Sequence, residues 1–113
     1  AHHRHKVDAP SGTALALGEV LAAVRGKPLA ALADHGRSGR TGSRQPGRIG
    51  FHAIRAGEIA GEHDVRLISA GEKIRLGHTA FGRDAFATGA LRAAAWLHGR
   101  SPGFFGMHDL LQG

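Results

Sequence analysis

The chain has 113 residues, of which 42% are hydrophobic, so it is long enough to bury the core of one compact unit. It has no cysteine, which excludes disulfides, thiolate metal sites and a cysteine nucleophile, and it has no apolar run of about 18 residues that could span a bilayer. Its net charge of +6 at pH 7 suits either nucleic acid or an anionic small molecule, and we expect a soluble, cytoplasmic protein without membrane contact.

The first predicted element is a loop that leads into a helix. A polar and basic segment runs up to Pro10, and residues 14–24 are apolar at helical spacing. Ser11 or Thr13 can cap this helix. A glycine and a proline are expected to end it, namely Gly26 and Pro28. Its buried stripe is predicted to consist of Leu17, Val20, Leu21 and Val24.

A glycine-rich segment follows, in which residues 36–47 lack large apolar side chains and predict a surface loop. Its arginines, Arg37, Arg40 and Arg44, are by default solvated side chains of that loop. Its glycines at positions 36, 39 and 42 are expected to follow no strand and to open no helix, unlike the glycines of a dinucleotide-binding turn.

Alternating apolar residues then predict three strands, which we expect to form a meander. They cover residues 49–53, 65–67 and 74–78, with breaks at residues 56–57 and 70–71. The histidines on these strands, His52, His63 and His78, are predicted to be packing or polar-network residues.

Helical spacing returns after Gly82, and this helix is predicted to end near Gly99. Phe86 and Trp96 are expected in its core, and the apolar tail at residues 102–111 needs a surface to lie on. The fold class that results is α+β, with a mixed or antiparallel sheet flanked by helices.

The chemistry is concentrated just before the first helix, where His2-His3-Arg4-His5-Lys6 gathers cations and proton donors. A helix start offers free backbone N–H groups and a positive dipole end. A carboxylate or phosphate placed over Ser11-Gly12-Thr13 could therefore take two or three hydrogen bonds, and Gly12 would let it approach the backbone closely. This combination suits the reduction of an anionic, imine-like substrate.

The segment His-His-Arg-His-Lys-x-Asp-x-Pro-Ser-Gly-Thr-Ala, which starts at His2, resembles the signature of the dihydrodipicolinate reductases of the bacterial and plant lysine pathway. The similarity continues through Gly39-Arg40-Thr41-Gly42-x-Arg44 and through residues 50–63, which include Gly61-Glu62-His63. It ends with residues 86–97, so that it covers essentially the whole chain.

The resemblance implies a role for each matching residue. It implies that His2 donates a proton and that Lys6 is a second catalytic cation. It also implies that the dicarboxylate substrate is bound by His3, Ser11, Gly12, Thr13 and Arg83. The family commonly has Ser-Arg at the last of these positions, whereas Arg83 here follows Phe81-Gly82.

The resemblance further implies an NADH- or NADPH-dependent reductase that converts the hydroxytetrahydrodipicolinate precursor to tetrahydrodipicolinate in lysine and diaminopimelate biosynthesis. No Gly-x-Gly-x-x-Gly turn opens a helix in this sequence, so the cofactor would be held mainly by a separate Rossmann domain. We therefore expect residues 1–113 to be the substrate-binding, catalytic and oligomerisation domain of a tetramer, a fragment that is inactive when isolated.

Other functions fit the sequence less well. The spacing of His2, His3 and His5 differs from that of the usual zinc ligands, since there is no distant fourth ligand and no i, i+4 pair of ligands on a helix. A small basic nucleic-acid-binding module is the main alternative, because the pI and the arginine-rich loop would permit it. No recognised binding motif supports it, tyrosine is absent, and we expect no nucleic-acid partner.

Overall fold

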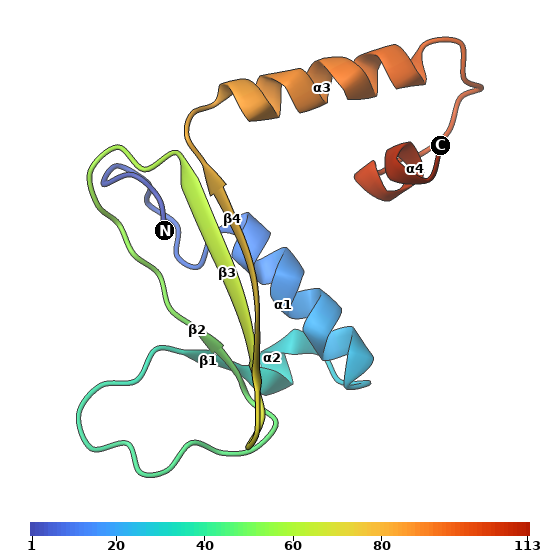
Figure 1. Ribbon diagram of the computed structural model, residues 1–113. Coiled ribbons are helices and arrows are strands. Elements are labelled where there is room, and N and C mark those ends of the chain that lie inside the picture. The colour runs from blue at the N-terminus through green and yellow to red at the C-terminus, as the bar shows by residue number, and fades with distance from the viewer. The chain divides into compact units, whose positions relative to one another are not determined.

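A computed structural model describes residues 1–113, which group into two compact units, Ala1–Thr79 and Ala80–Gly113, where the chain length predicts a single one (Figure 1). The first unit contains two helices and most of the strands. These are α1 (Gly12–Val24), α2 (Leu29–Leu32), β1 (Ala33–His35), β2 (Ile49–Phe51), β3 (Gly61–Ile68) and β4 (Lys73–Ala80), which ends at the boundary. The second unit contains α3 (Asp84–Leu97) and α4 (Met107–Gln112). The α+β class is confirmed, and no helix is long and apolar enough to cross a membrane.

The first helix begins and ends where the sequence predicts. Ser11 is its N-cap, and the Ser11 side-chain oxygen accepts a hydrogen bond from the Ala14 N–H at 3.2 Å. The chain leaves the helix through Gly26, whose φ of 62° lies in the left-handed region that glycine adopts without strain.

The predicted buried stripe of α1 is wrong in part. Val20 and Val24 are 64% and 84% exposed, and Leu17 is also exposed. The buried residues of the helix are instead Gly18 and Ala22, which face a core formed by Leu29, Leu32 and Ile49 with Leu21 and Phe51 packed against it. The reason is close approach: a Cβ built on Gly18 would lie 2.5 Å from the Phe51 Cζ, so only a residue without a side chain fits there.

The predicted meander is also wrong. Strand β2 pairs in parallel with β1, with Ala33 opposite Ile49 and His35 opposite Phe51, while β3 and β4 form a separate two-stranded sheet. Strand β1 escaped prediction because Ala33-Asp34-His35 is short and has no β-branched residue. It is nevertheless placed next to β2 because it follows α2, which packs on α1, and because β2 itself packs on α1.

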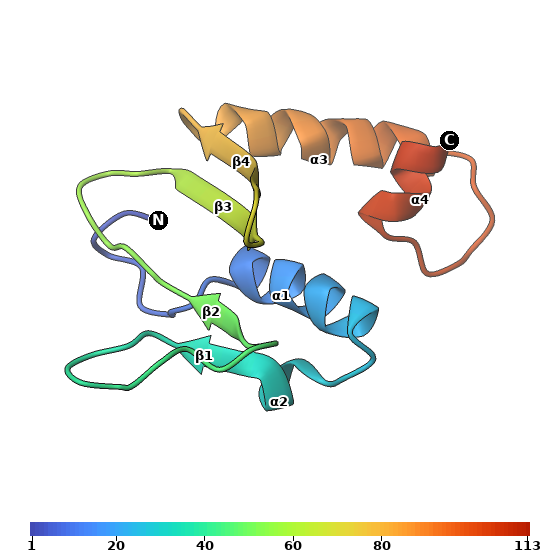
Figure 2. The same ribbon diagram turned by 60° about the horizontal axis from the view of Figure 1, so that its bottom comes forward.

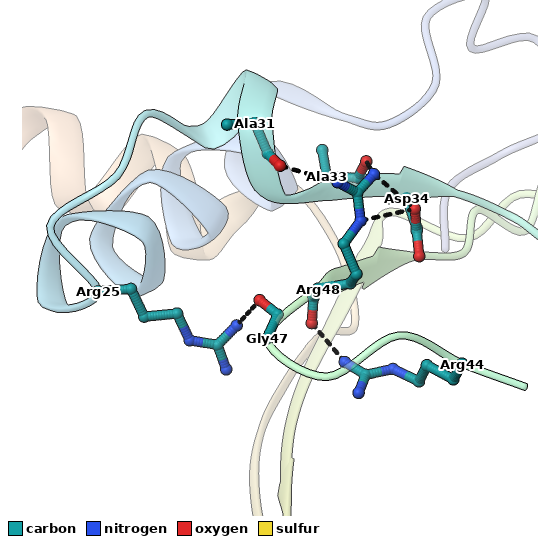
Figure 3. A network of polar contacts seen from close by, with 7 residues as sticks. All are labelled: Arg25, Ala31, Ala33, Asp34, Arg44, Gly47 and Arg48. Carbon is teal, nitrogen blue, oxygen red and sulfur yellow. Dashed lines mark hydrogen bonds and ion pairs between the residues drawn. The ribbon is translucent and has the colours of Figure 1, made fainter.

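Arg48 holds the base of the loop between β1 and β2 (Figure 3). Its guanidinium donates to the Asp34 carboxylate at 2.7 and 3.0 Å, to the Ala31 carbonyl at 2.8 Å and to the Ala33 carbonyl at 2.7 Å. These hydrogen bonds lower the pKa of the Asp34 carboxyl. One guanidinium thus joins the end of α2 to both strands, which a lysine could not do with the same geometry.

The loop itself is exposed, as predicted, and extends away from α1 in both ribbon views (Figures 1 and 2). The expectation that its glycines follow no strand is wrong, because β1 comes directly before Gly36. The expectation that they open no helix is confirmed, because the loop leads into β2. The loop therefore lacks the strand–turn–helix geometry of a dinucleotide-binding turn.

The second unit has little core of its own. Helix α3 spans the predicted residues, but none of them is buried, and Phe86 is 52% exposed rather than in a core. Trp96 is half-buried, since the Phe105 ring packs edge-on against it at 5.5 Å and the Arg100 guanidinium lies 3.6 Å from its ring centroid. The apolar tail contacts α3 through Phe105 and forms the short helix α4, but Phe104, Met107 and Leu111 stay exposed.

The close contact at Gly18 can be tested by a matched pair of Gly-to-Ala changes. Gly18→Ala should lower the free energy of unfolding by about 1–3 kcal/mol, because the new methyl group displaces the Phe51 ring from a packed core. Gly89→Ala is the control, since that glycine also lies in a helix and its Cβ would meet nothing within 4 Å. There alanine should be neutral or raise stability by about 0.5–1 kcal/mol. Equal effects in urea unfolding would contradict this account of the core.

Candidate functional site

The first residues of the chain are held between two other segments. The Ala1 N–H and carbonyl both bond to Glu62 at the start of β3, at 2.7 and 2.9 Å. His2 forms a parallel bridge with Arg55, in which its N–H donates to the Ile54 carbonyl and its carbonyl accepts from the Ala56 N–H, each at 3.0 Å. The backbone of His2, the predicted proton donor, is therefore fixed on both sides.

The imidazole of His2 lies against that of His63 on β3, with ring centroids 5.0 Å apart and planes at 67°. His63 in turn reaches the helix start, because its Nε2 lies 3.2 Å from the Ser11 Oγ. The structure thus brings His63 into contact with both His2 and Ser11, which belong to a distant segment of the sequence. His63 occupies the polar-network position predicted for the strand histidines.

Lys6 is held by a nearby carboxylate. Its Nζ lies 2.6 Å from the Asp8 Oδ1, and this contact lowers the pKa of the Asp8 carboxyl. The Asp8 carbonyl accepts a hydrogen bond from the Arg55 guanidinium, which ties the segment before Pro10 to the strand-like residues beside His2. The ammonium group is therefore positioned rather than free in solvent.

The start of α1 has the features expected of an anion cradle. Ser11 is only 6% exposed, and it is the one polar residue of the chain that is buried. The Ser11 hydroxyl oxygen accepts a hydrogen bond from the Ala14 N–H, and the Ser11 carbonyl accepts one from the Leu15 N–H. The N–H groups of Gly12 and Thr13 are left without a partner in the chain. Gly12 and Thr13 are exposed, and a Cβ on Gly12 would meet nothing within 4 Å, so a ligand can approach these donors.

Not all predicted residues meet in one cavity. A cleft of about 1080 Å³ between α1 and β3 is lined by His2, Ser11 and His63 together with apolar residues of both elements. His3, Lys6, Gly12 and Thr13 do not line it. Arg83 belongs to the second unit, where its carbonyl accepts from Phe86 and Ala87 at the start of α3 and its side chain is exposed.

Both clustered histidines have a pKa below the ordinary imidazole value of 6.5. For His2 the causes are burial first, then the positive charges of His63, the chain's terminal ammonium, Lys6 and Arg55. For His63 they are burial, the terminal ammonium and His78. Burial and neighbouring cations both disfavour imidazolium, so both rings are mainly neutral at pH 7.

Sequence reasoning from the residues alone missed the partners of the motif. Asp8 lies inside the signature segment, but nothing in its spacing showed that it would pair with Lys6. Arg55 and His63 are contributed by strand-like segments far along the chain. The only signal for His63 was its place in the matching Gly61-Glu62-His63 segment, which does not reveal a contact with Ser11.

Comparison with known proteins gives the same family along the whole chain. Residues 1–111 match the family described as dihydrodipicolinate reductase, C-terminus. The chain is 59% identical over 111 residues to the 4-hydroxy-tetrahydrodipicolinate reductase of Dinoroseobacter shibae, which is 98% of this chain and 41% of that protein. It is 57% identical over 110 residues to the protein of that name from Acidiphilium cryptum, covering 97% and 44% respectively.

The protein of that name from Thiobacillus denitrificans is 53% identical over 111 residues, covering 98% of this chain and 42% of that protein. The chain thus spans about two fifths of the length of the curated relatives it matches. No finding supports the nucleic-acid-binding alternative.

The lowered pKa values of His2 and His63 predict how stability depends on pH. Between the folded-state pKa values and 6.5 the unfolded chain binds more protons than the folded chain, so the free energy of unfolding should fall as pH is lowered through 6.5. The loss should level off below the folded-state pKa values. Urea unfolding between about pH 7.5 and about pH 5 measures this slope.

Replacing both histidines by glutamine should make that slope shallower, because two groups that take up protons on unfolding are removed. Asp64→Asn is the control. The pKa of this carboxyl is lowered from 3.8 by a hydrogen bond from Arg75, so it stays ionised over the whole range and its loss should leave the slope unchanged. An unaltered slope in the double histidine variant would contradict the assignment.

Proposed function

The chain belongs to the dihydrodipicolinate reductase family, whose C-terminal region it matches, and from this premise we propose that it is the substrate-binding and proton-donating part of a reductase. The substrate is hydroxytetrahydrodipicolinate or its dehydrated form, a cyclic dicarboxylate with an imine, and the product is tetrahydrodipicolinate of lysine and diaminopimelate biosynthesis. The observation that carries the proposal is the contact of His2 with His63, which itself meets the capping serine of the helix start. His63 thus contacts both the proposed proton donor and the helix start that we propose to bind the substrate carboxylate.

The hydroxylated form first loses water to give the dehydrated form, and reduction of the latter then needs a hydride and a proton. NADH or NADPH would supply the hydride, and the residues present here do not fit a dinucleotide, because the glycine-rich loop runs from strand to strand and lies wholly exposed. The cofactor is therefore held by a domain outside residues 1–113. Within this chain, one substrate carboxylate lies over the free N–H groups of Gly12 and Thr13, and His3 contacts the substrate beside them.

His2 delivers the proton. Its lowered pKa makes the imidazolium a stronger acid but leaves the resting ring mainly neutral at pH 7. A bound dianion reverses the effect of the neighbouring cations, because a nearby negative charge favours imidazolium. Substrate binding therefore favours protonation of the His2 imidazole, which then donates this proton in the reaction.

Lys6 supplies a fixed positive charge. It contributes in the bound state and contributes more as negative charge develops on the substrate during hydride addition. Asp8 holds the Lys6 ammonium at 2.6 Å and so directs it. Arg83 is assigned a supporting contact with the substrate.

The same chain carries the contacts that assemble a cytoplasmic homotetramer. Large apolar side chains are left uncovered on β3 and β4, among them Ile68, Ile74 and Leu76, which are 72%, 50% and 61% exposed. In the second unit Phe81 and Phe104 are fully exposed and Leu91 is 73% exposed. Apolar side chains and open strand edges of this extent favour association with further copies.

The catalytic assignment is tested in a chimera, in which residues 1–111 replace the matching part of the Dinoroseobacter shibae reductase. The isolated chain should show no turnover with NADH or NADPH, and the chimera should restore it. In the chimera, His2→Gln should lower kcat by about 10²–10⁴-fold with little change in KM, because it keeps a polar side chain but removes the titrating proton.

Matched variants separate proton donation from binding. Gly12→Ala and Thr13→Val should mainly raise KM, because each disturbs the donors at the helix start. Lys6→Met should damage both kcat and KM. A normal kcat with a raised KM in His2→Gln would make this residue a binding group and would overturn its assignment as the acid.

The assembly is tested by sedimentation of the chimera and of the isolated chain at micromolar concentration. A tetramer is expected for the chimera, and association is expected for the isolated chain as well, since the apolar side chains of β3, β4 and α3 belong to it. Leu91→Glu and Ile74→Glu should shift both proteins towards smaller species. A monodisperse monomer of the unaltered chimera would contradict the proposal.

A further inference from the structure

The Ser11 hydroxyl is more constrained than a usual helix cap. It is buried, and its oxygen accepts the Ala14 N–H at 3.2 Å, so one of its lone pairs is already used. Its own hydrogen needs an acceptor, because an unsatisfied buried hydroxyl is costly. The nearest side-chain partner is the Nε2 of His63, at 3.2 Å.

His63 also contacts the predicted proton donor. Its ring meets that of His2 edge-on at 5.0 Å, and both rings are packed against Gly61. A Cβ on Gly61 would lie 3.5 Å from the His2 Nε2 and 3.8 Å from the His63 Cε1. One imidazole on β3 therefore touches both halves of the candidate site, the helix start and the acid.

We propose that His63 is a positioning residue. Its Nε2 accepts the Ser11 hydroxyl hydrogen while its ring supports the imidazole of His2, so that the anion-binding helix start and the proton donor stay fixed relative to each other. This inference rests on the proposed function. It requires His63 to be neutral with its proton on Nδ1, which agrees with its lowered pKa. The Ser11 hydroxyl is then fully used within the protein, and the donors left for a substrate carboxylate are the N–H groups of Gly12 and Thr13.

The charged groups around His63 favour its neutral form. Burial lowers the pKa of His63 most, and the positive charge of His78 acts in the same direction. His63 also lines a small polar pocket of about 310 Å³ together with Glu62, Asp64, Arg75 and His78. The Asp64 carboxylate there is paired with Arg75 at 2.7 Å and is not a hydrogen-bond partner of His63.

The first experiment measures dipicolinate binding to the 113-residue chain by calorimetry, in the unaltered protein and in three variants. His63→Leu should bind about tenfold more weakly, since the helix start loses one hydrogen bond that orders it. His63→Gln should recover most of the affinity, because its amide oxygen reaches the position of Nε2. The shorter side chain of His63→Asn places its amide near the position of Nδ1, so it cannot accept the Ser11 hydrogen bond. This variant should bind dipicolinate as weakly as His63→Leu. His98→Gln, a change at an exposed histidine of the second unit, should bind normally.

Two further measurements keep the proposal testable if a variant folds poorly. In the unaltered chain, nitrogen chemical shifts should show His63 protonated on Nδ1 at neutral pH. In a double-mutant cycle, His63→Leu should add little to Ser11→Ala, because both remove the same hydrogen bond. In the chimera, His63→Leu should lower kcat as well as raise KM, because His2 loses its support.

The outcomes separate this inference from the proposed function. If the unaltered chain does not bind dipicolinate, or the chimera is inactive, the proposed function fails. If the unaltered protein binds and turns over but His63→Leu matches it, or asparagine rescues as well as glutamine, the positioning role is overturned while the proposed function stands. A proton on Nε2 of His63 in the folded chain at neutral pH would also overturn it.

Discussion

The candidate site depends on one hydrogen-bonded helix start. Ser11 caps α1 with its hydroxyl, and this residue is the only polar one that the fold buries. Helix α1 also carries the Gly18 and Ala22 face on which the core of the first unit packs. The same cap therefore fixes the direction of the helix that supports the core and exposes the two N–H groups that suit a carboxylate.

Local signals in the sequence were enough to predict α1, α3 and the strands β2, β3 and β4, but not α2, β1 or which strands pair. The ends of α1 and α3 can be predicted from helix-capping and helix-breaking residues such as Ser11 and Gly26, because these residues affect only the nearest few positions of the chain. The pairing of β2 with β1 depends on Arg48 and on packing against α1, which are tertiary contacts. The stripe of α1 was mispredicted because hydrophobicity was taken as the sign of burial, whereas close packing against Phe51 selects the smallest residues.

The candidate site shows the same division. The residues from His2 to Thr13 are contiguous, so the family motif identified them in the sequence. The predicted helix start then gave a physical reason for anion binding at this segment. The residues that hold them, Arg55 and His63, come from segments about fifty residues away, and only the fold shows that they meet the motif. Arg83 lies in the second unit, so its part in the site rests on the family resemblance alone.

The charges around His2 link the proposed binding of a dicarboxylate to the protonation of this histidine. Burial lowers the pKa of the His2 imidazole first, and the positive charges of His63, Lys6 and Arg55 act in the same direction, so the unliganded ring is mainly neutral at pH 7. The surplus of positive charge also favours binding of the dicarboxylate that we propose as substrate. Once bound, that anion would neutralise the surplus and favour the imidazolium when a proton is needed. In the proposed reaction, these positive charges would therefore couple substrate binding to protonation of His2.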